Sequence, residues 1–278
     1  MEDVMFVKMV IPEEVVTLQN INKWLDELVL FSPTKMRTKL TERKFNVKQL
    51  QRELETLFSN EEVYFQLDLN DDTSSFTLTK GVRQLPSILC MFNKSVYDKI
   101  SVNEIVEKFN SFFQIYNGIV GYAVSCEDQT WQNNTDIEAF IESNRSLEHV
   151  TFKPDFFHKD KEMIDIESFP GHNHFSKEGI WFGSSWKMWF GKKYYSFIPK
   201  DKLLAFSDGF QNLEFNDESI SIVLYENIWE YDKPINRAIQ WKFRKVVGID
   251  EVAHKVINKS KTPNRWSERL NISVEPLR

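Results

Sequence analysis

The sequence is poor in the residues that mark fibrous, low-complexity or disulfide-linked proteins. Its 278 residues include nine glycines, nine prolines and two cysteines. So few glycines and prolines exclude a collagen-like or low-complexity chain, and two cysteines are too few for a disulfide framework. Cys90 and Cys126 lie in apolar or strand-like surroundings. We expect them to be buried thiols in a reducing compartment.

Long apolar runs are also missing. The first residues, MEDVMFVKMVIPEEVV, carry acids where a secretory signal needs a basic segment, and they lack a continuous apolar stretch. The most aromatic stretch, residues 179–197, contains Lys187, Lys192 and Lys193. A transmembrane helix needs roughly twenty mostly apolar residues, so this stretch does not span a membrane. The sequence therefore predicts a cytoplasmic protein with no membrane partner.

An excess of basic residues is absent as well. The formal net charge is −6 and the isoelectric point is about 5.5, which disfavours a protein that neutralises nucleic-acid phosphates. Residues 127–178 hold twelve acids and five lysines or arginines, whereas residues 33–55 and 242–269 are basic. An acidic surface attracts a basic protein and speeds its docking. We predict a basic protein partner and interpret the two basic runs as solvated helix faces.

Catalytic and cofactor-binding motifs are few. No phosphate-binding glycine loop occurs, and Gly183-Ser184-Ser185-Trp186 lacks the second glycine of a nucleophile elbow. The nearest approach to a metal motif is Pro170-Gly171-His172-Asn173-His174, whose two imidazoles could share one metal with a carboxylate. The other histidines are scattered. We predict no cofactor, and keep a metal-dependent hydrolase or nuclease that uses His172 and His174 as an alternative.

The pattern of apolar residues predicts an α+β fold with a mixed, largely antiparallel sheet and flanking helices. Helical spacing indicates helices over about 12–30, 46–58, 234–246 and 250–257, with Asn46 and Asp250 as N-caps and Gly248 as a C-cap. Ser101 and Glu104 form a capping box before another amphipathic helix. Strands are expected in VYFQLDL, SFTLTKGV, SILCMFN, IVGYAVSC, MIDIESF, IWFGSSWKMWF, YYSFI and SISIVLYEN.

The order of these elements divides the chain into three parts. Residues 1–145 form a helix-rich α+β half, residues 146–258 a strand-rich α+β half, and residues 259–278 a polar tail. Each half contains a succession of strand, strand, helix and strand. We therefore expect two similar α+β halves.

The aromatic stretch carries tryptophan on both sides of the strand expected over 180–190. Alternation places Trp181 and Trp189 on one face and Trp186 on the other. This indicates either a central strand covered on both faces or a face kept for a partner. Tryptophan is enriched in binding hot spots. Our hypothesis for the partner-binding site is Trp131, Trp181, Trp186 and Trp189, with Asp165, Glu167 and Glu178 as acidic contacts.

The end of the chain resembles immunity proteins of bacterial polymorphic-toxin systems. The resemblance rests on the succession KKYYSFIPKDKLLAF, NLEF, SISIVLYEN and AIQWKFRKVVGIDEVAHK and covers about the last hundred residues. It implies a non-catalytic inhibitor that neutralises a toxin by stoichiometric binding, as an antitoxin does. An alternative with the same binding physics is a phage or mobile-element inhibitor of a host defence complex. No counterpart is found for the N-terminal part.

Overall fold

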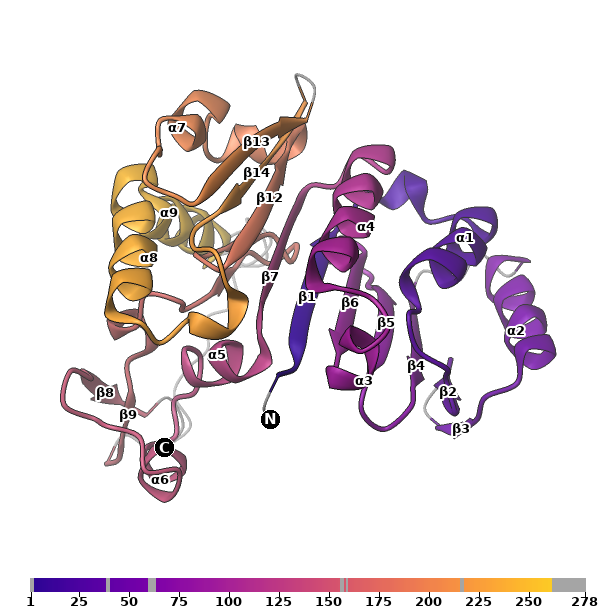
Figure 1. The fold of residues 1–278 in the computed structure, drawn as a ribbon, viewed down its shortest axis with the longest axis horizontal. Coiled ribbons are helices and arrows are strands. Elements are labelled where there is room, and N and C mark those ends of the chain that lie inside the picture. Colours follow the sequence, from indigo (N-terminus) through magenta and orange to yellow (C-terminus); the bar gives the residue numbers. More distant parts are fainter. Residues whose placement is uncertain are drawn as a thin grey trace, which may run out of the picture.

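The strands of the first hundred residues alternate buried and half-exposed side chains, as expected for a sheet with one covered face. In β5 (Ser75–Lys80), Phe76 and Leu78 are buried, while Thr77 and Thr79 are partly exposed. The computed structural model describes residues 3–38, 41–59, 64–155, 158, 160–215 and 218–261. A ten-stranded sheet runs through this part of the chain in the order β13-β14-β12-β7-β1-β6-β5-β4-β2-β3 (Figure 1).

Every pairing within this sheet is antiparallel, which confirms the predicted α+β fold. Two short hairpins, β8 with β9 and β10 with β11, lie outside it. The remaining strands are β1 (Met5–Val10), β2 (Lys35–Arg37), β3 (Arg43–Lys44), β4 (Phe65–Asn70), β6 (Ser87–Phe92), β7 (Val120–Ser125), β8 (Phe152–Pro154), β9 (Glu162–Ile164), β10 (His174–Phe175), β11 (Trp181–Phe182), β12 (Lys187–Gly191), β13 (Gln211–Phe215) and β14 (Ser219–Val223).

Two of the helices begin where capping residues predict. Asn46 accepts a hydrogen bond from the backbone of Gln49 at the start of α2, and the capping box of Ser101 and Glu104 opens α4. The α-helices are α1 (Leu18–Leu28), α2 (Val47–Ser59), α3 (Lys94–Tyr97), α4 (Val102–Ile115), α5 (Cys126–Trp131), α6 (Ile137–Glu142), α7 (Lys200–Leu204), α8 (Pro234–Val247) and α9 (Ile249–Lys261). Short 3-10 helices are η1 (Glu13–Val15), η2 (Ile166–Ser168), η3 (Lys192–Ser196) and η4 (Ile228–Glu230).

Several predicted elements take a different form. The helix expected over 12–30 is divided into η1 and α1, because the Thr17 side chain caps a new helix by accepting from Asn20. The single strand expected over 180–190 is broken into β11 and β12, and the residues predicted as a strand YYSFI lie largely in η3. Strand β1, which pairs with both β6 and β7, was not predicted.

Helices cover opposite faces at the two ends of the sheet. In the view of Figure 1, α1, α2 and α4 lie to one side of β1 to β6, whereas α8 and α9 lie to the other side of β12 and β14. Phe92 of β6 packs on Phe109 of α4, and Phe190 of β12 packs on Phe243 of α8. Strand β12 lies where the two arrangements meet, because its Trp189 side chain also bonds Asn110 of α4.

The sheet also joins the two halves expected from the sequence. Strand β7 from the first half pairs directly with β12 from the second, so both halves share one sheet. The apolar core extends without a break from α1 and α2 to α8 and α9. Cys90 and Cys126 are buried and form no disulfide within the described residues, as predicted. Of the predicted tail, residues 259–261 end α9, and residues 262–278, with Trp266, lie outside the described residues.

Candidate functional site

The tryptophans of the aromatic stretch are core residues. Trp181, Trp186 and Trp189 are between 0 and 4% exposed. Each indole N–H donates a hydrogen bond within the protein: Trp181 to Asn173 at 2.6 Å, Trp186 to the carbonyl of Tyr225 at 2.8 Å, and Trp189 to Asn110 at 2.7 Å. A buried indole needs such a partner. The interpretation of this stretch as a strand covered on both faces therefore fits the structure, because a partner cannot reach these three rings.

The other predicted binding residues come from three separate segments, and Asp165 accepts the backbone N–H of Glu167 at 3.4 Å. Trp131 is half-buried at the end of α5, with the Arg145 guanidinium 4.4 Å from its ring centroid. Asp165 caps η2 and pairs with Lys153 at 2.8 Å. Glu178 is exposed in the connection between β10 and β11. Only Glu167, in η2, joins the two histidines His172 and His174 in a common polar network.

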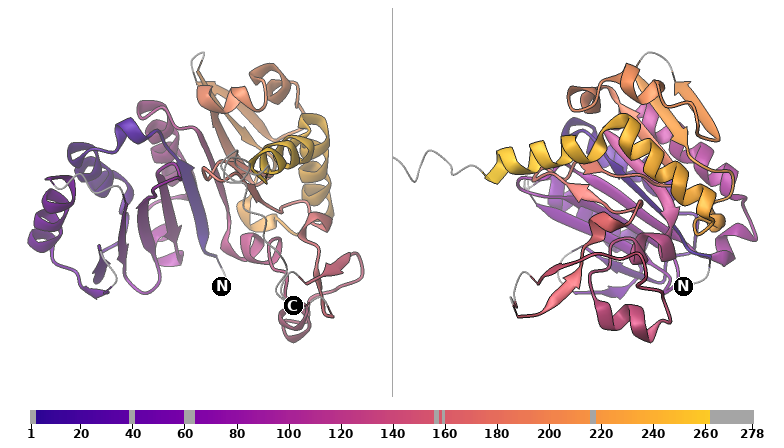
Figure 2. Two further views of the ribbon diagram at one scale, coloured as in Figure 1. Left: turned by 180° about the vertical axis from the view of Figure 1, so that it is seen from behind. Right: turned by 90° about the vertical axis from the view of Figure 1, so that its left-hand side faces the viewer.

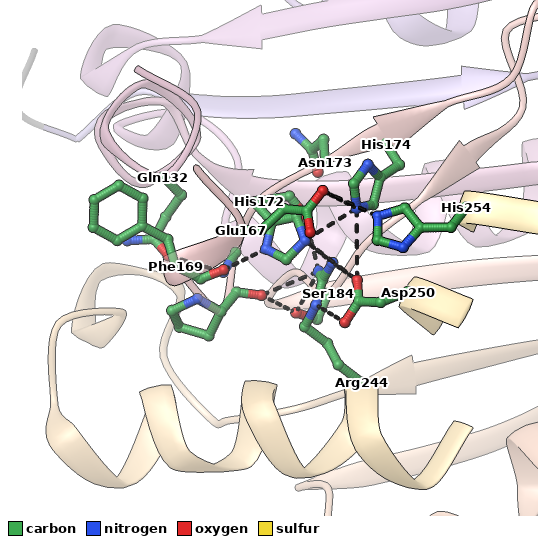
Figure 3. A network of polar contacts seen from close by, with 12 residues as sticks. Gln132, Glu167, Phe169, His172, Asn173, His174, Ser184, Arg244, Asp250 and His254 are labelled. Carbon is green, nitrogen blue, oxygen red and sulfur yellow. Dashed lines mark hydrogen bonds and ion pairs between the residues drawn. The ribbon is translucent and has the colours of Figure 1, made fainter. Parts of the chain in front are cut away.

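This network is built from segments that are distant in sequence. The Pro170-Gly171 turn brings His172 inward, and Gly171 donates its backbone N–H to the Gln132 side chain at 2.8 Å. A Cβ at Gly171 would lie 2.8 Å from the Gln132 side chain, so the close approach requires glycine. His174 follows in β10. Arg244 from α8 and Asp250 and His254 from α9 complete the network (Figure 3).

Arg244 is the centre of the buried part. Its side chain is 1% exposed, and Nη1 donates to the carbonyl oxygens of His172 at 2.8 Å and Pro170 at 3.2 Å. Nε donates to Asp250 Oδ2 at 3.2 Å, and Nη2 also donates to Asp250. Partial burial alone would raise the pKa of the Asp250 carboxyl, but the contacts with His172 and with the Arg244 guanidinium hold that pKa far below its ordinary value. The guanidinium thus fastens the His172 loop to α8 and α9.

The tautomer of His172 follows from its two contacts. Nδ1 lies 2.5 Å from the carbonyl oxygen of Phe169, which can only accept, so Nδ1 carries the proton. In the neutral imidazole with its proton on Nδ1, Nε2 is the acceptor, and Arg244 Nη2 donates to it at 2.5 Å. Asp250 Oδ1 lies 3.2 Å from the same Nε2 because both atoms accept from one guanidinium. The lone pair that His172 could offer a metal is already used.

A second cluster lies beside the first and reaches the surface. Glu167, His174 and His254 point toward one another in Figure 3, from η2, β10 and α9. The His254 Nε2 to Glu167 Oε1 distance is 3.0 Å, and the His174 Nε2 to Glu167 Oε1 distance is 3.9 Å. Burial lowers the pKa of His174 to about 4, with the neighbouring His172 and Arg244 contributing. His174 is therefore neutral at pH 7.

Sequence reasoning found only part of this network. It singled out His172, His174 and Glu167, but it treated His254 as scattered and Asp250 as the N-cap of the last helix. In the structure α9 begins at Ile249, so Asp250 lies in its first turn and bonds Arg244. The four-residue spacing of Asp250 and His254 places both on one helix face, which was a detectable signal. Nothing in the sequence linked them to residues some eighty positions earlier.

An acidic segment, residues 132–169, projects beyond the sheet at the lower left of Figure 1 and carries α6, β8 and β9. Figure 2 shows the same projection from the side. Phe140 packs on Trp131 and Phe169, at ring-centroid distances of 5.0 and 5.8 Å, and holds α6 against the body. Its exposed acids are Asp136, Glu138, Glu142, Glu148, Asp160, Glu162 and Glu167.

Comparison with known proteins gives a likeness of fold. No protein-family model matches the chain, and no curated protein matches it significantly. Among solved structures, the Pseudomonas aeruginosa T6SS protein PA0821 superposes with a TM-score of 0.55 and 13% sequence identity. The superposition covers 98% of this chain and 87% of that one. At this identity the likeness shows a shared fold. Within the described residues, no helix combines the length and apolarity needed to cross a membrane.

Proposed function

We propose that this protein is a cytoplasmic immunity protein that neutralises a bacterial toxin by stoichiometric binding. The observation that carries the proposal is the fold likeness to a T6SS protein over nearly the whole chain. The resemblance of the last hundred residues to immunity proteins of polymorphic-toxin systems supports the same class of function. A non-catalytic inhibitor needs a stable scaffold and one complementary surface, and the continuous core supplies the scaffold.

The acidic segment is the surface that we propose for the toxin. The buried tryptophans cannot reach a partner, whereas the acids of this segment are exposed. Two apolar side chains lie among them: Ile141 is 59% and Phe152 is 42% exposed. Apolar side chains among acidic ones favour a partner that has an apolar patch bordered by basic residues. The partner is thus a basic toxin domain.

Co-purification followed by a protection assay tests this function. The chain is co-expressed with each neighbouring gene whose product resembles a toxin, and we expect one of these products to form a one-to-one complex and cell growth to be restored. Recovery of a host defence complex in place of a toxin would replace this proposal with the anti-defence alternative. A protein that binds neither a toxin nor a host defence complex would refute both.

Charge reversal tests the surface separately. Glu142→Lys combined with Glu148→Lys should weaken toxin binding at least tenfold, mainly by slowing association, with a smaller loss at high salt. The matched control is Asp26→Lys with Glu27→Lys, an equal change of charge on exposed positions of α1. Equal weakening in both double variants would show that only net charge matters and would remove the acidic segment from the proposal.

A further inference from the structure

We propose that Glu167, His174 and His254 form a binding site for one divalent transition-metal ion of the zinc class. Their ligand atoms lie within 4.8 Å of one another, and two imidazoles with one carboxylate are a donor set that Zn²⁺ accepts. The site goes beyond the proposed function, since it needs neither a toxin nor a catalytic step.

The distances place these atoms near the geometry that the ion requires. Zinc binds imidazole nitrogen and carboxylate oxygen at roughly 2.0–2.2 Å, so tetrahedral ligand atoms lie about 3.3 Å apart. Glu167 Oε1 lies 3.0 Å from His254 Nε2 and 3.9 Å from His174 Nε2. Small side-chain rotations of Glu167 and His254, which are 41% and 47% exposed, would equalise these distances.

The contacts of the buried network determine which histidine can bind the ion. His172, His174 and Asp250 also lie close enough to surround an ion, but the Arg244 guanidinium already bonds both His172 and Asp250. The positively charged Arg244 guanidinium thus already occupies that position, and Asp250 balances its charge. The sequence pair His172 and His174 is therefore divided: His172 orders the loop, and His174 Nε2, which lies 3.2 Å from His172 Nε2, would exchange that contact for the ion of the outer cluster.

The position of the cluster also fixes what the ion would do. Its three ligands come from η2, β10 and α9, which are joined only through tertiary structure. A bound ion would cross-link the base of the acidic segment to the last helix. Three protein ligands leave a fourth position open toward solvent, where water or a donor from a partner can bind.

Metal titration of the untagged, chelator-treated protein tests the site. We expect one equivalent of Zn²⁺ to bind with a Kd in the micromolar range or tighter, measured by competition with a chromophoric chelator. Cobalt substitution should give visible d–d absorption bands of four-coordinate Co²⁺. Thermal unfolding should shift upward with metal, because an ion that binds only the folded state stabilises it.

Ligand variants decide whether this cluster is responsible. His254→Ala and Glu167→Gln should each weaken zinc binding at least tenfold and remove the cobalt bands, and both positions are exposed enough to keep the fold. His158→Ala, which removes an exposed histidine outside the cluster, should bind zinc like the unmodified protein. Millimolar affinity in the unmodified protein, or an unchanged Kd in His254→Ala, would overturn the proposal.

Discussion

The two ends of the sheet bury their side chains in different ways. In β4, β5 and β6, buried residues alternate with half-exposed ones, since helices α2 and α4 cover one face. In β12 and β14 every residue is buried. Strand β12 packs Phe190 against α8 on one face and Trp189 against α4 on the other. The same antiparallel sheet is therefore an amphipathic layer at β5 and β6 and a fully covered core at β12 and β14, while its edge strand β13 is largely exposed.

This difference also governs the charged groups. In the first part, ion pairs such as Lys80 with Glu13 lie at the surface, where the Glu13 side chain is 66% exposed. In the second part, Arg244 is 1% exposed and Lys187 is 2% exposed. Charged groups near α8, α9 and β12 are thus shielded from water, and each needs an opposite charge or hydrogen-bond partners. Substitutions in the two parts should have unequal effects.

The largest expected effect is the loss of a core aromatic side chain. Trp189→Ala removes packing from a fully covered strand and the hydrogen bond to Asn110, and we expect it to lower the free energy of unfolding by about 4 kcal/mol. Leu89→Ala, on the uncovered face of β6, should cost about 1 kcal/mol. Urea unfolding measures both. Equal losses would contradict the difference between the two ends, and Trp189→Phe serves as a milder change if the alanine variant does not fold.

Removing a buried cation should come next. Arg244→Met leaves Asp250, His172 and two backbone carbonyls without their donor, and we expect a loss of about 3 kcal/mol. Lys80→Met breaks a surface pair and should cost less than about 1 kcal/mol. The unfolding midpoint at constant slope measures each change. A loss for Arg244→Met as small as that for Lys80→Met would show that the network contributes little to stability.

The smallest expected effect concerns the buried lysine of β12. Burial lowers the pKa of Lys187 to about 8, below the value of 10.5 for a free lysine. Between these two pH values the unfolded chain binds more protons, so stability from this residue rises as pH increases and is lowest below pH 8. Lys187→Met should therefore stabilise the protein at pH 7, on the order of 2 kcal/mol, and the gain should shrink toward pH 10.

The control for this prediction is Lys23→Met, at an exposed position of α1. Its stability should follow that of the unmodified protein across the same pH range. Differences between variants cancel the tyrosine ionisations common to all three proteins. A stabilisation by Lys187→Met that does not change between pH 7 and pH 10 would contradict a lowered lysine pKa as its cause.

Local chemistry predicted the elements that depend on neighbouring residues. The capping box at Ser101, the Asn46 cap of α2 and the hairpin of β4 and β5 were all anticipated. Gly248 ends α8 with φ of 69°, as a glycine C-cap should. Each depends on interactions over a few residues. The strand β1 was missed because Lys8 interrupts its apolar pattern and its pairing with β6 and β7 spans some eighty to one hundred and twenty residues.

Residue alternation predicted only part of the structure of the aromatic stretch. Alternation correctly indicated that β12 carries large side chains on both faces, but it could not say whether helices or a partner covered them. It also extended the strand through Gly183 and Ser184, where the chain leaves one sheet and enters another. Both outcomes depend on α4 and α8, which pack on β12 from opposite sides.

The sequence by itself therefore determined the α+β class, the capped helices and the acidic character of residues 127–178, because composition and short-range hydrogen bonds are local properties. Only the tertiary structure decided that three tryptophans lie in the core, that Arg244 occupies the space between His172 and Asp250, and that His254 joins Glu167 and His174. These contacts join segments about seventy to ninety residues apart. Their formation depends on how helices and strands pack, which no local pattern records.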